Sequence, residues 1–445
     1  MFPNPNLAGR WGGVAVLSLT LALPTRAQSV GEMTRQQAVS QALSQLSTYS
    51  QSLGNVTISA MEQQVAEAAR RPKLEIAAAE TVTSPALNDY AGTPFSFVSA
   101  NGVLRTNALL RLRGEFDTSG ALGEDVARTD ALKRAAAAGS LVARQTLVLN
   151  TEQAFYTLSL AQAKVAGSRL NLGTARQLQD VTGLLLQAGE VPGVDLERAQ
   201  LAVRDRQVEL QTNLAGEATA RETLRAYLGL TPQAPLAASA LPDTAPAPEE
   251  LSAYSAEWTR RRPEFAQLQA QQESYQHEAA VARDALLPHL TYSVGVGVDT
   301  ASLLPQGFAS GLGLQAQLAL LIPFDDGGVA DARAKQAEAR EQQVVAARSL
   351  AERQVVQQYQ TAHALAETAV ERIARSHENL TQAEHIHRLA VARYRAGEAR
   401  IIEVTDALNN LSLQRTAWLQ AEADYQLALA QLRYAVAAPP PEGPQ

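Results

Sequence analysis

The acidic residues with the most informative spacing are Glu403 and Asp406, which follow the segment 394–398 (YRAGE). A separation of three positions puts both carboxylates on one face of a helix. Several copies of this pair, brought close together, would attract cations. A solvated helix N-terminus explains the same residues equally well, because acidic side chains there suit the helix dipole. The residues alone leave both interpretations open.

Two other pairs of residues suggest metal binding. His385 and His387 stand two positions apart on a predicted helix, so they point to different faces, and we interpret them as surface residues. Asp325 and Asp326 fit a helix-capping turn better than a calcium site. The chain has no cysteine, and it has no nucleophile elbow, phosphate loop, zinc motif or nucleotide fingerprint. We therefore expect no enzyme activity, no cofactor and no metal.

The composition favours an exported helical protein. The 445 residues are 46% hydrophobic but only 5% aromatic, with a net charge of −7, which is typical of long helices with small-residue contacts. No basic stripe indicates nucleic-acid binding. An apolar segment at 12–24, followed by small residues up to Ala27, predicts a signal peptide over 1–27. An uncleaved anchor is the alternative, but this segment is short for a bilayer, and we expect no transmembrane helix.

Landmarks recur at a constant offset, which indicates an internal repeat. Gly189 and Gly397, each within Ala-Gly-Glu, stand 208 positions apart, and so do Gly120 and Gly328. A proline-rich segment separates the two halves. The predicted divisions are a first repeat at 28–228, a linker at 229–250, a second repeat at 251–437 and a disordered tail at 438–445.

Each repeat has the pattern helix, strand, loop, strand, very long helix, break, helix. Alternation of apolar and polar residues predicts the strands, and a period near 3.6 predicts the helices. In the first helix of the chain we expect a break around Gly54, and we expect a helix over 251–286. The expected strands are 73–81, 104–116, 289–299 and 312–322, and the expected long helices are 122–188 and 330–395.

The second long helix carries a stripe with alternating spacings of four and three, which is typical of a coiled coil. So long a helix needs lateral packing for its stability. A closed ring of helices would provide it. An ordinary coiled-coil rod is the alternative, although a rod would not need strands. The stripe consists of Val355, Tyr359, Ala362, Ala366, Ala369, Ile373, Ser376, Leu380 and Ala383.

Four strands are too few to close a barrel, and open sheet edges are not tolerated in lipid. Their length and alternation match a membrane barrel; a soluble sandwich is the alternative. Eight strands from two chains would leave a filled interior, whereas twelve from three chains would leave a lumen. Arg105, Arg111 and Arg113 lie on a polar strand face and need water, so we place them in the lumen of a trimer. The predicted fold class is mainly α with a small β part.

The chain resembles the TolC-type outer-membrane efflux proteins over essentially the whole mature sequence. The resemblance rests on 286–290 (LLPHL), 323–328 (PFDDGG) and 394–398 (YRAGE), followed by Glu403 and Asp406. It implies a homotrimer with a twelve-stranded β-barrel in outer-membrane lipid and an α-helical barrel across the periplasm. The partners it implies are a periplasmic adaptor and an inner-membrane transporter of the RND, ABC or MFS class.

The resemblance also assigns roles at the periplasmic tip. Glu403 and Asp406 would form an acidic ring at a gate. The turns would lie where the adaptor docks, and they consist of Ala188, Gly189 and Glu190 in the first repeat and Ala396, Gly397 and Glu398 in the second.

A latch between the two tip hairpins is implied as well. Its tyrosine matches Tyr394, and the acidic partner matches Asp195. The arginine of the family pattern corresponds to Ala399, with Arg400 one residue later, and its partner position holds Val194. That half of the latch is therefore absent or rewired in this chain.

The predicted function is an outer-membrane exit duct of a tripartite export pump. Its cargo would be small toxic compounds, as in multidrug efflux, or proteins, as in type I secretion. A periplasmic coiled-coil adaptor without a pore is the alternative. Such an adaptor would need a β-rich module between its helical arms, where this chain has only the linker at 229–250.

Overall fold

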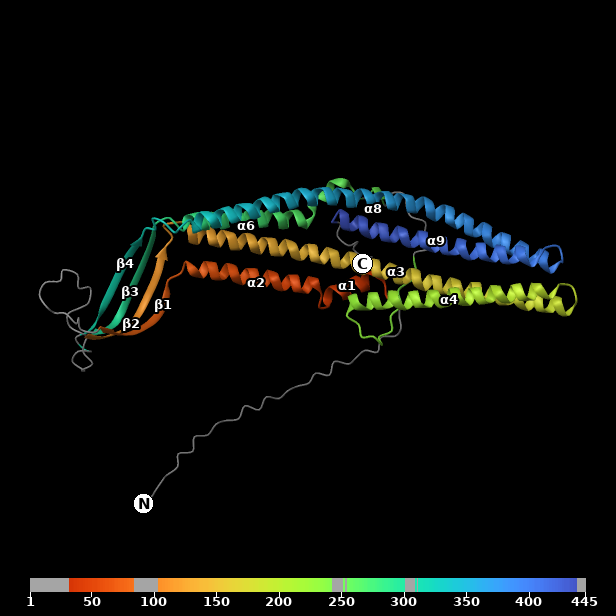
Figure 1. Cartoon of the computed structure of the whole chain (residues 1–445), viewed down its shortest axis with the longest axis horizontal. Helices are drawn as coiled ribbons and strands as arrows, with labels where there is room; N and C mark the ends of the chain where they lie inside the picture. The colour runs from red at the N-terminus through yellow and green to blue at the C-terminus, as the bar shows by residue number, and fades with distance from the viewer. Residues whose placement is uncertain are drawn as a thin grey trace, which may run out of the picture.

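The computed structural model describes residues 32–83, 103–241, 251–252, 254–300, 309 and 311–437. The predicted signal peptide, the tail at 438–445 and part of the linker lie outside these residues. The molecule is elongated, with a sheet at one end and two helical hairpins at the other (Figure 1). No helix in the described ranges has the length and apolar composition needed to span a bilayer.

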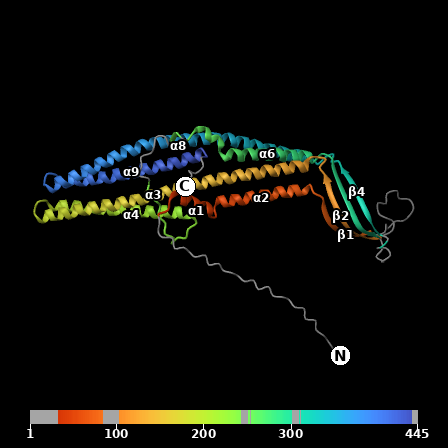
Figure 2. The same cartoon turned by 180° about the vertical axis from the view of Figure 1, so that it is seen from behind.

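Two helices of equal length, α3 and α8, run along most of the molecule, and each contains 67 residues. At 1.5 Å per residue each is roughly 100 Å long. Each turns back into an antiparallel helix, α4 after α3 and α9 after α8, while α2 and α6 flank them toward the sheet (Figures 1 and 2). The helices are α1 (Arg35–Ser44), α2 (Thr48–Ala69), α3 (Ala121–Gln187), α4 (Gly193–Leu228), η1 (Ala256–Arg261), α6 (Pro263–Asp284), α8 (Val329–Arg395) and α9 (Ile401–Ala435).

The four strands form one antiparallel sheet in the order β1-β2-β3-β4. Each repeat contributes one hairpin, so the pairing of β2 with β3 joins the two halves of the chain. The outer strands β1 and β4 each leave one edge open within the chain. The strands are β1 (Lys73–Thr83), β2 (Val103–Phe116), β3 (His289–Thr300) and β4 (Leu312–Leu321).

The predicted fold class is confirmed, and the strands and long helices lie within two residues of their expected bounds. Two helix predictions were wrong. The first break lies just before Ser47, because the Ser47 hydroxyl caps α2 by accepting from the Ser50 backbone N–H. Gly54 lies inside α2, and a Cβ there would meet open space, so glycine costs only helix propensity. The helix expected over 251–286 is interrupted: η1 comes first, and α6 begins at Pro263, which occupies its first turn.

The small-residue stripe of the second long helix is also confirmed. Seven of its nine residues are buried, and Tyr359 and Ile373 are half-buried against the same cluster. Ala362, Ala366 and Ala369 pack against α9, where Tyr425, Leu429 and Leu432 complete the cluster. Small side chains let these helices approach closely, so lateral contact stabilises them as expected. The buried members are Val355, Ala362, Ala366, Ala369, Ser376, Leu380 and Ala383.

A buried ionic network joins the beginning, middle and end of the chain. Glu152 of α3 is only 3% exposed and accepts hydrogen bonds from Arg35 of α1 and Arg433 of α9. The Arg433 Nη2 atom lies 3.0 Å from Glu152 Oε2. Burial raises the pKa of the neighbouring Tyr156 phenol. Since buried charges are tolerated only when paired, this network fixes α1 against the long helices.

Candidate functional site

One face of the sheet is both apolar and exposed. Successive side chains of a strand point to opposite faces, and the register aligns Leu74, Leu112 and Val294 on three adjacent strands. Exposure reaches 82% at Ile76 and 75% at Leu314. An apolar surface of this extent needs an apolar partner. Its exposed members are Leu74, Ile76, Leu110, Leu112, Val294, Val296, Leu312, Leu314, Leu318 and Leu320.

Aromatic side chains end this apolar face on the side of the helices. The rings of Phe116 and Tyr292 lie 4.6 Å apart between centroids. Tyr292 covers Gly114, where an added Cβ would lie 2.5 Å from the tyrosine hydroxyl oxygen. An aromatic border on an apolar band is typical of a membrane interface.

The opposite face is polar, and the structure places Arg105, Arg111 and Arg113 on it. Both Asp299 carboxylate oxygens accept from Arg105, at 2.7 and 2.8 Å. Arg113 pairs with Glu75 at 3.2 Å. Across the described residues no ion pair involves Arg111. The sheet therefore separates an apolar surface from a charged one.

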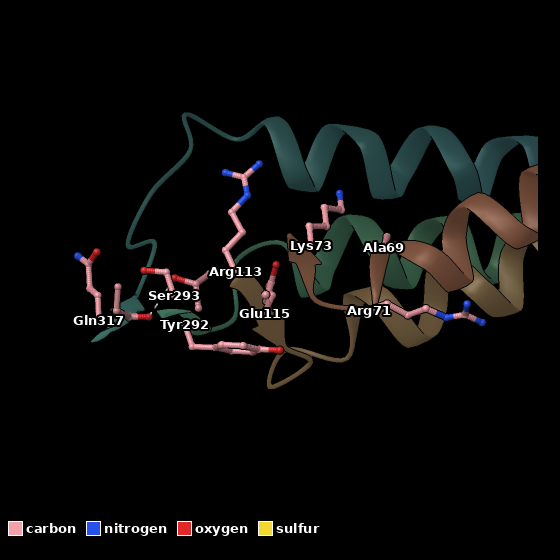
Figure 3. Close-up of a pocket in the computed structure, with 11 residues that line it drawn as sticks. Ala69, Arg71, Lys73, Arg113, Glu115, Tyr292, Ser293 and Gln317 are labelled. Atoms are coloured by element: carbon pink, nitrogen blue, oxygen red, sulfur yellow. Dashed lines mark hydrogen bonds between the residues drawn. The ribbon is translucent and has the colours of Figure 1, made fainter. Parts of the chain in front are cut away.

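The polar face is hollowed where the sheet meets the helices. A pocket of about 410 Å³ lies there, and Lys73, Arg113, Glu115, Ser293 and Gln317 are among its lining residues. Figure 3 shows Lys73 and Arg113 extending to the same side of the sheet. Glu115 pairs with His289 Nδ1 at 2.9 Å rather than with either cation.

At the far end of the molecule, the two Ala-Gly-Glu turns have the same geometry. Gly189 and Gly397 both have φ of 75°, which glycine adopts without the steric cost of a Cβ. The Glu190 N–H donates to the Leu185 carbonyl, and the Glu398 N–H donates to the Arg393 carbonyl, each at 2.9 Å. This six-to-one hydrogen bond defines a Schellman C-cap. Both hairpins thus turn sharply without loose chain at the tip.

Tyr394 lies between the two hairpins. It is 3% exposed and packs with Leu178, Ala199, Ile401 and Val404, which come from α3, α4 and α9. Burial raises the pKa of the Tyr394 phenol; a hydrogen bond with Thr182 opposes this shift and nearby Asp195 adds to it.

The structure brings the predicted Tyr394–Asp195 pair together, with the hydroxyl 3.5 Å from Asp195 Oδ2, which is the outer limit of a hydrogen bond. The positions predicted for the other half of the latch form no polar pair with each other among the described residues. Val194 is exposed, and Ala399 packs beside the tip cluster. Arg400 caps α9 through its backbone N–H, which donates to Glu403 Oε1 at 3.2 Å.

Glu403 and Asp406 both lie exposed on the first turns of α9. Glu403 has two partners, the Arg400 backbone N–H and the Arg393 guanidinium, the latter at 3.7 Å. The Asp406 carboxylate has no hydrogen bond or ion pair with any of the described residues. Within one chain, Glu403 therefore also stabilises the start of α9, as the helix-dipole interpretation predicts.

Two contacts at the tip were not anticipated from the sequence. Arg393 approaches Glu403 across the second turn, and Thr182 of α3 contacts the Tyr394 hydroxyl. Neither pair has a helical spacing that would have pointed to it. The sharp turn creates the first contact, and packing between α3 and α8 creates the second.

Comparison with known proteins finds one matching family model and several solved structures with a similar fold. The family model described as outer membrane efflux protein matches residues 256–438. The fold is similar to that of the outer-membrane channel OprN, with 19% identity, a TM-score of 0.78 and coverage of 91% of this chain and 90% of that chain. The Campylobacter jejuni CmeC outer membrane channel has 14% identity, a TM-score of 0.79 and coverage of 97% and 94%.

The outer membrane protein VceC from Vibrio cholerae has 18% identity, a TM-score of 0.78 and coverage of 90% of this chain and 95% of that chain. At these identities the likeness establishes the fold. No curated protein sequence matches the chain.

Proposed function

We propose that this chain, whose residues 256–438 carry the outer membrane efflux protein domain, is the outer-membrane exit duct of an export pump. The sheet supports this proposal most directly, because its exposed apolar face and charged opposite face suit a wall between lipid and water. The long helices would extend the duct away from the membrane.

The duct requires three copies of the chain. The open edges of β1 and β4 would pair between neighbours, which removes every sheet edge from the lipid. Twelve strands then enclose a lumen, with Arg105, Arg111 and Arg113 on its wall. We place the complex in the outer membrane, with its helices in the periplasm.

The partners proposed for the complex act at the tip. The turns at Ala188, Gly189 and Glu190 and at Ala396, Gly397 and Glu398 would dock a periplasmic adaptor, which links the duct to an inner-membrane transporter of the RND, ABC or MFS class. Small toxic compounds or secreted proteins would pass without chemical change.

Fractionation and conductance test the proposed function. We expect the protein in a urea-resistant outer-membrane fraction, and we expect discrete single-channel currents from the purified complex in planar bilayers. A protein that is found soluble in the periplasm, and that gives no conductance, would contradict the duct.

We predict that replacing Glu403 with Gln and Asp406 with Asn weakens current block by Gd³⁺ by about tenfold, because rings of carboxylates bind multivalent cations. The glutamine oxygen can still accept from the Arg400 N–H, so the helix cap is retained. Bilayer recordings with Gd³⁺ on the helix side measure this. Glu190→Gln, which removes an exposed tip carboxylate outside the proposed ring, is the control; equal block in all three proteins would refute the ring.

We predict that Tyr394→Phe raises the frequency of channel opening several-fold, since losing one long hydrogen bond costs about 1 kcal/mol. The raised pKa of the Tyr394 phenol means that this contribution is complete below its ordinary value of 10.0 and is lost as pH rises above it. Single-channel recording measures the opening. Tyr359→Phe, which loses a 3.0 Å bond to the Tyr254 carbonyl far from the tip, should change nothing; equal behaviour of the two variants would rule out the latch.

A further inference from the structure

The polar face of the sheet carries more cations than its carboxylates balance. Lys73 and Arg111 remain without an ion pair or side-chain hydrogen bond to any residue that the structure describes. Both lie on the same face as Arg113. Lys73 stands opposite Arg113 in the register of β1 and β2, and Arg111 is two positions from Arg113 on β2. The carboxylates of this face are engaged elsewhere, in the pairs Asp299–Arg105, Glu75–Arg113 and Glu115–His289.

The strand register explains why Arg111 stays unpaired. On β1 it stands opposite Glu75, but the carboxylate of Glu75 reaches Arg113. On β3 it stands opposite Gly295, which has no side chain. Beyond the glycine, β4 presents the neutral Gln315.

Lys73 lies close to Arg111 and is open to solvent. Lys73 pairs in register with Arg113, so Arg111 is its diagonal neighbour, at roughly 7–8 Å between Cα atoms. Lys73 lines the pocket at the base of the sheet together with Ser293 and Gln317, whose hydroxyl and amide groups can donate hydrogen bonds. Cations beside neutral donors form a suitable site for an anion.

We propose that Lys73 and Arg111 form a cationic ring near the helix-side end of the barrel, and that this ring favours the passage of solutes bearing phosphate, sulfate or carboxylate groups. The inference rests on the proposed function, because only a trimeric barrel turns three polar faces toward one lumen. Rings of Arg and Lys select anions in pores, and low-dielectric walls strengthen their field. Neither side chain pairs with a residue that the structure describes, so pairing within the described part of the sheet does not account for these charges.

Block by a polyanion from the sheet side tests the ring. The full-length protein is inserted from one side into a bilayer of zwitterionic lipid, and inositol hexakisphosphate is added on the opposite side, which the sheet end faces. We expect block of the wild-type current, and a half-blocking concentration about tenfold higher for Lys73→Gln with Arg111→Gln. Raising the salt concentration should weaken the wild-type block, because exposed charges are screened. Because the blocker is added on the sheet side, it meets the sheet before the acidic residues of the helix tip, so those residues do not determine the measured block.

The matched control is Arg105→Gln with Asp299→Asn, which removes one cation and one acid from the same face and leaves its net charge unchanged. We expect block within about twofold of wild type for this control. If the double cation variant yields no channels, Lys73→Gln and Arg111→Gln are measured singly, and each should give part of the rise. Conducting channels that are not blocked, or are blocked equally in every variant, would overturn the cationic ring and leave the duct standing. A wild-type protein without conductance would overturn the duct and the ring together.

Discussion

Gly297→Val is expected to reduce assembled protein in the outer membrane by at least about tenfold, because overpacking against atoms that cannot move costs several kcal/mol. A Cβ at position 297 would lie 2.1 Å from the Ala108 carbonyl oxygen and 2.8 Å from the Leu109 Cα. Both atoms belong to the backbone of β2, so relief requires separating β2 from β3. That pairing is the contact that joins the hairpins of the two repeats.

Gly313 provides a matched control for this substitution. It is the register partner of Gly297 on β4 and lies on the same face of the sheet, but a Cβ there meets nothing within 4 Å. Gly313→Val should therefore assemble like wild type. Quantifying the heat-resistant, membrane-inserted form on gels measures both variants, and normal assembly of the Gly297 variant would show that β2 and β3 are not paired as described.

Glu152→Ala is expected to lower the free energy of unfolding by about 3–5 kcal/mol, since removing one member of a buried ionic network leaves uncompensated charge. The variant leaves Arg35 and Arg433 without their shared carboxylate, in a region where both are largely shielded from water. The Arg433 Nε atom already lacks a hydrogen-bond partner among the described residues, and the neutral Tyr156 phenol beside the guanidinium cannot balance its charge.

Denaturant unfolding of the detergent-solubilised protein, followed by helical circular dichroism, measures this change. Glu352→Ala is the control: its carboxylate is 57% exposed and lies 3.4 Å from Arg348 one turn away on α8. Loss of such a surface pair should cost about 0–1 kcal/mol. Equal losses in the two variants would mean that the Glu152 network is not buried as described.

Local rules predicted much of this fold from the sequence. The Ala-Gly-Glu segments mark both tip turns, because the positive φ at Gly189 and Gly397 strongly favours glycine. Alternation of apolar and polar residues located all four strands and also assigned their faces. The repeat at 208 positions made each half a check on the other.

The remaining features depend on contacts between distant segments. Arg105 and Asp299 stand 194 positions apart, and only the register of β2 against β3 brings them together. For the same reason, the sequence did not show which of the three arginines on β2 would lack a partner. Helix propensity alone predicts a break at Gly54, whereas the side-chain cap at Ser47 decides the boundary before α2.

The equal lengths of α3 and α8 fix the distance between the sheet and the tip. Deleting one residue from either helix would shorten it by about 1.5 Å and rotate everything beyond by about 100°. The two tip turns would then no longer stand level, and the buried stripe would rotate away from its neighbour. A change in the distance between the sheet and the tip must therefore occur in both repeats together. A deletion in one half of the sequence predicts a compensating deletion in the other.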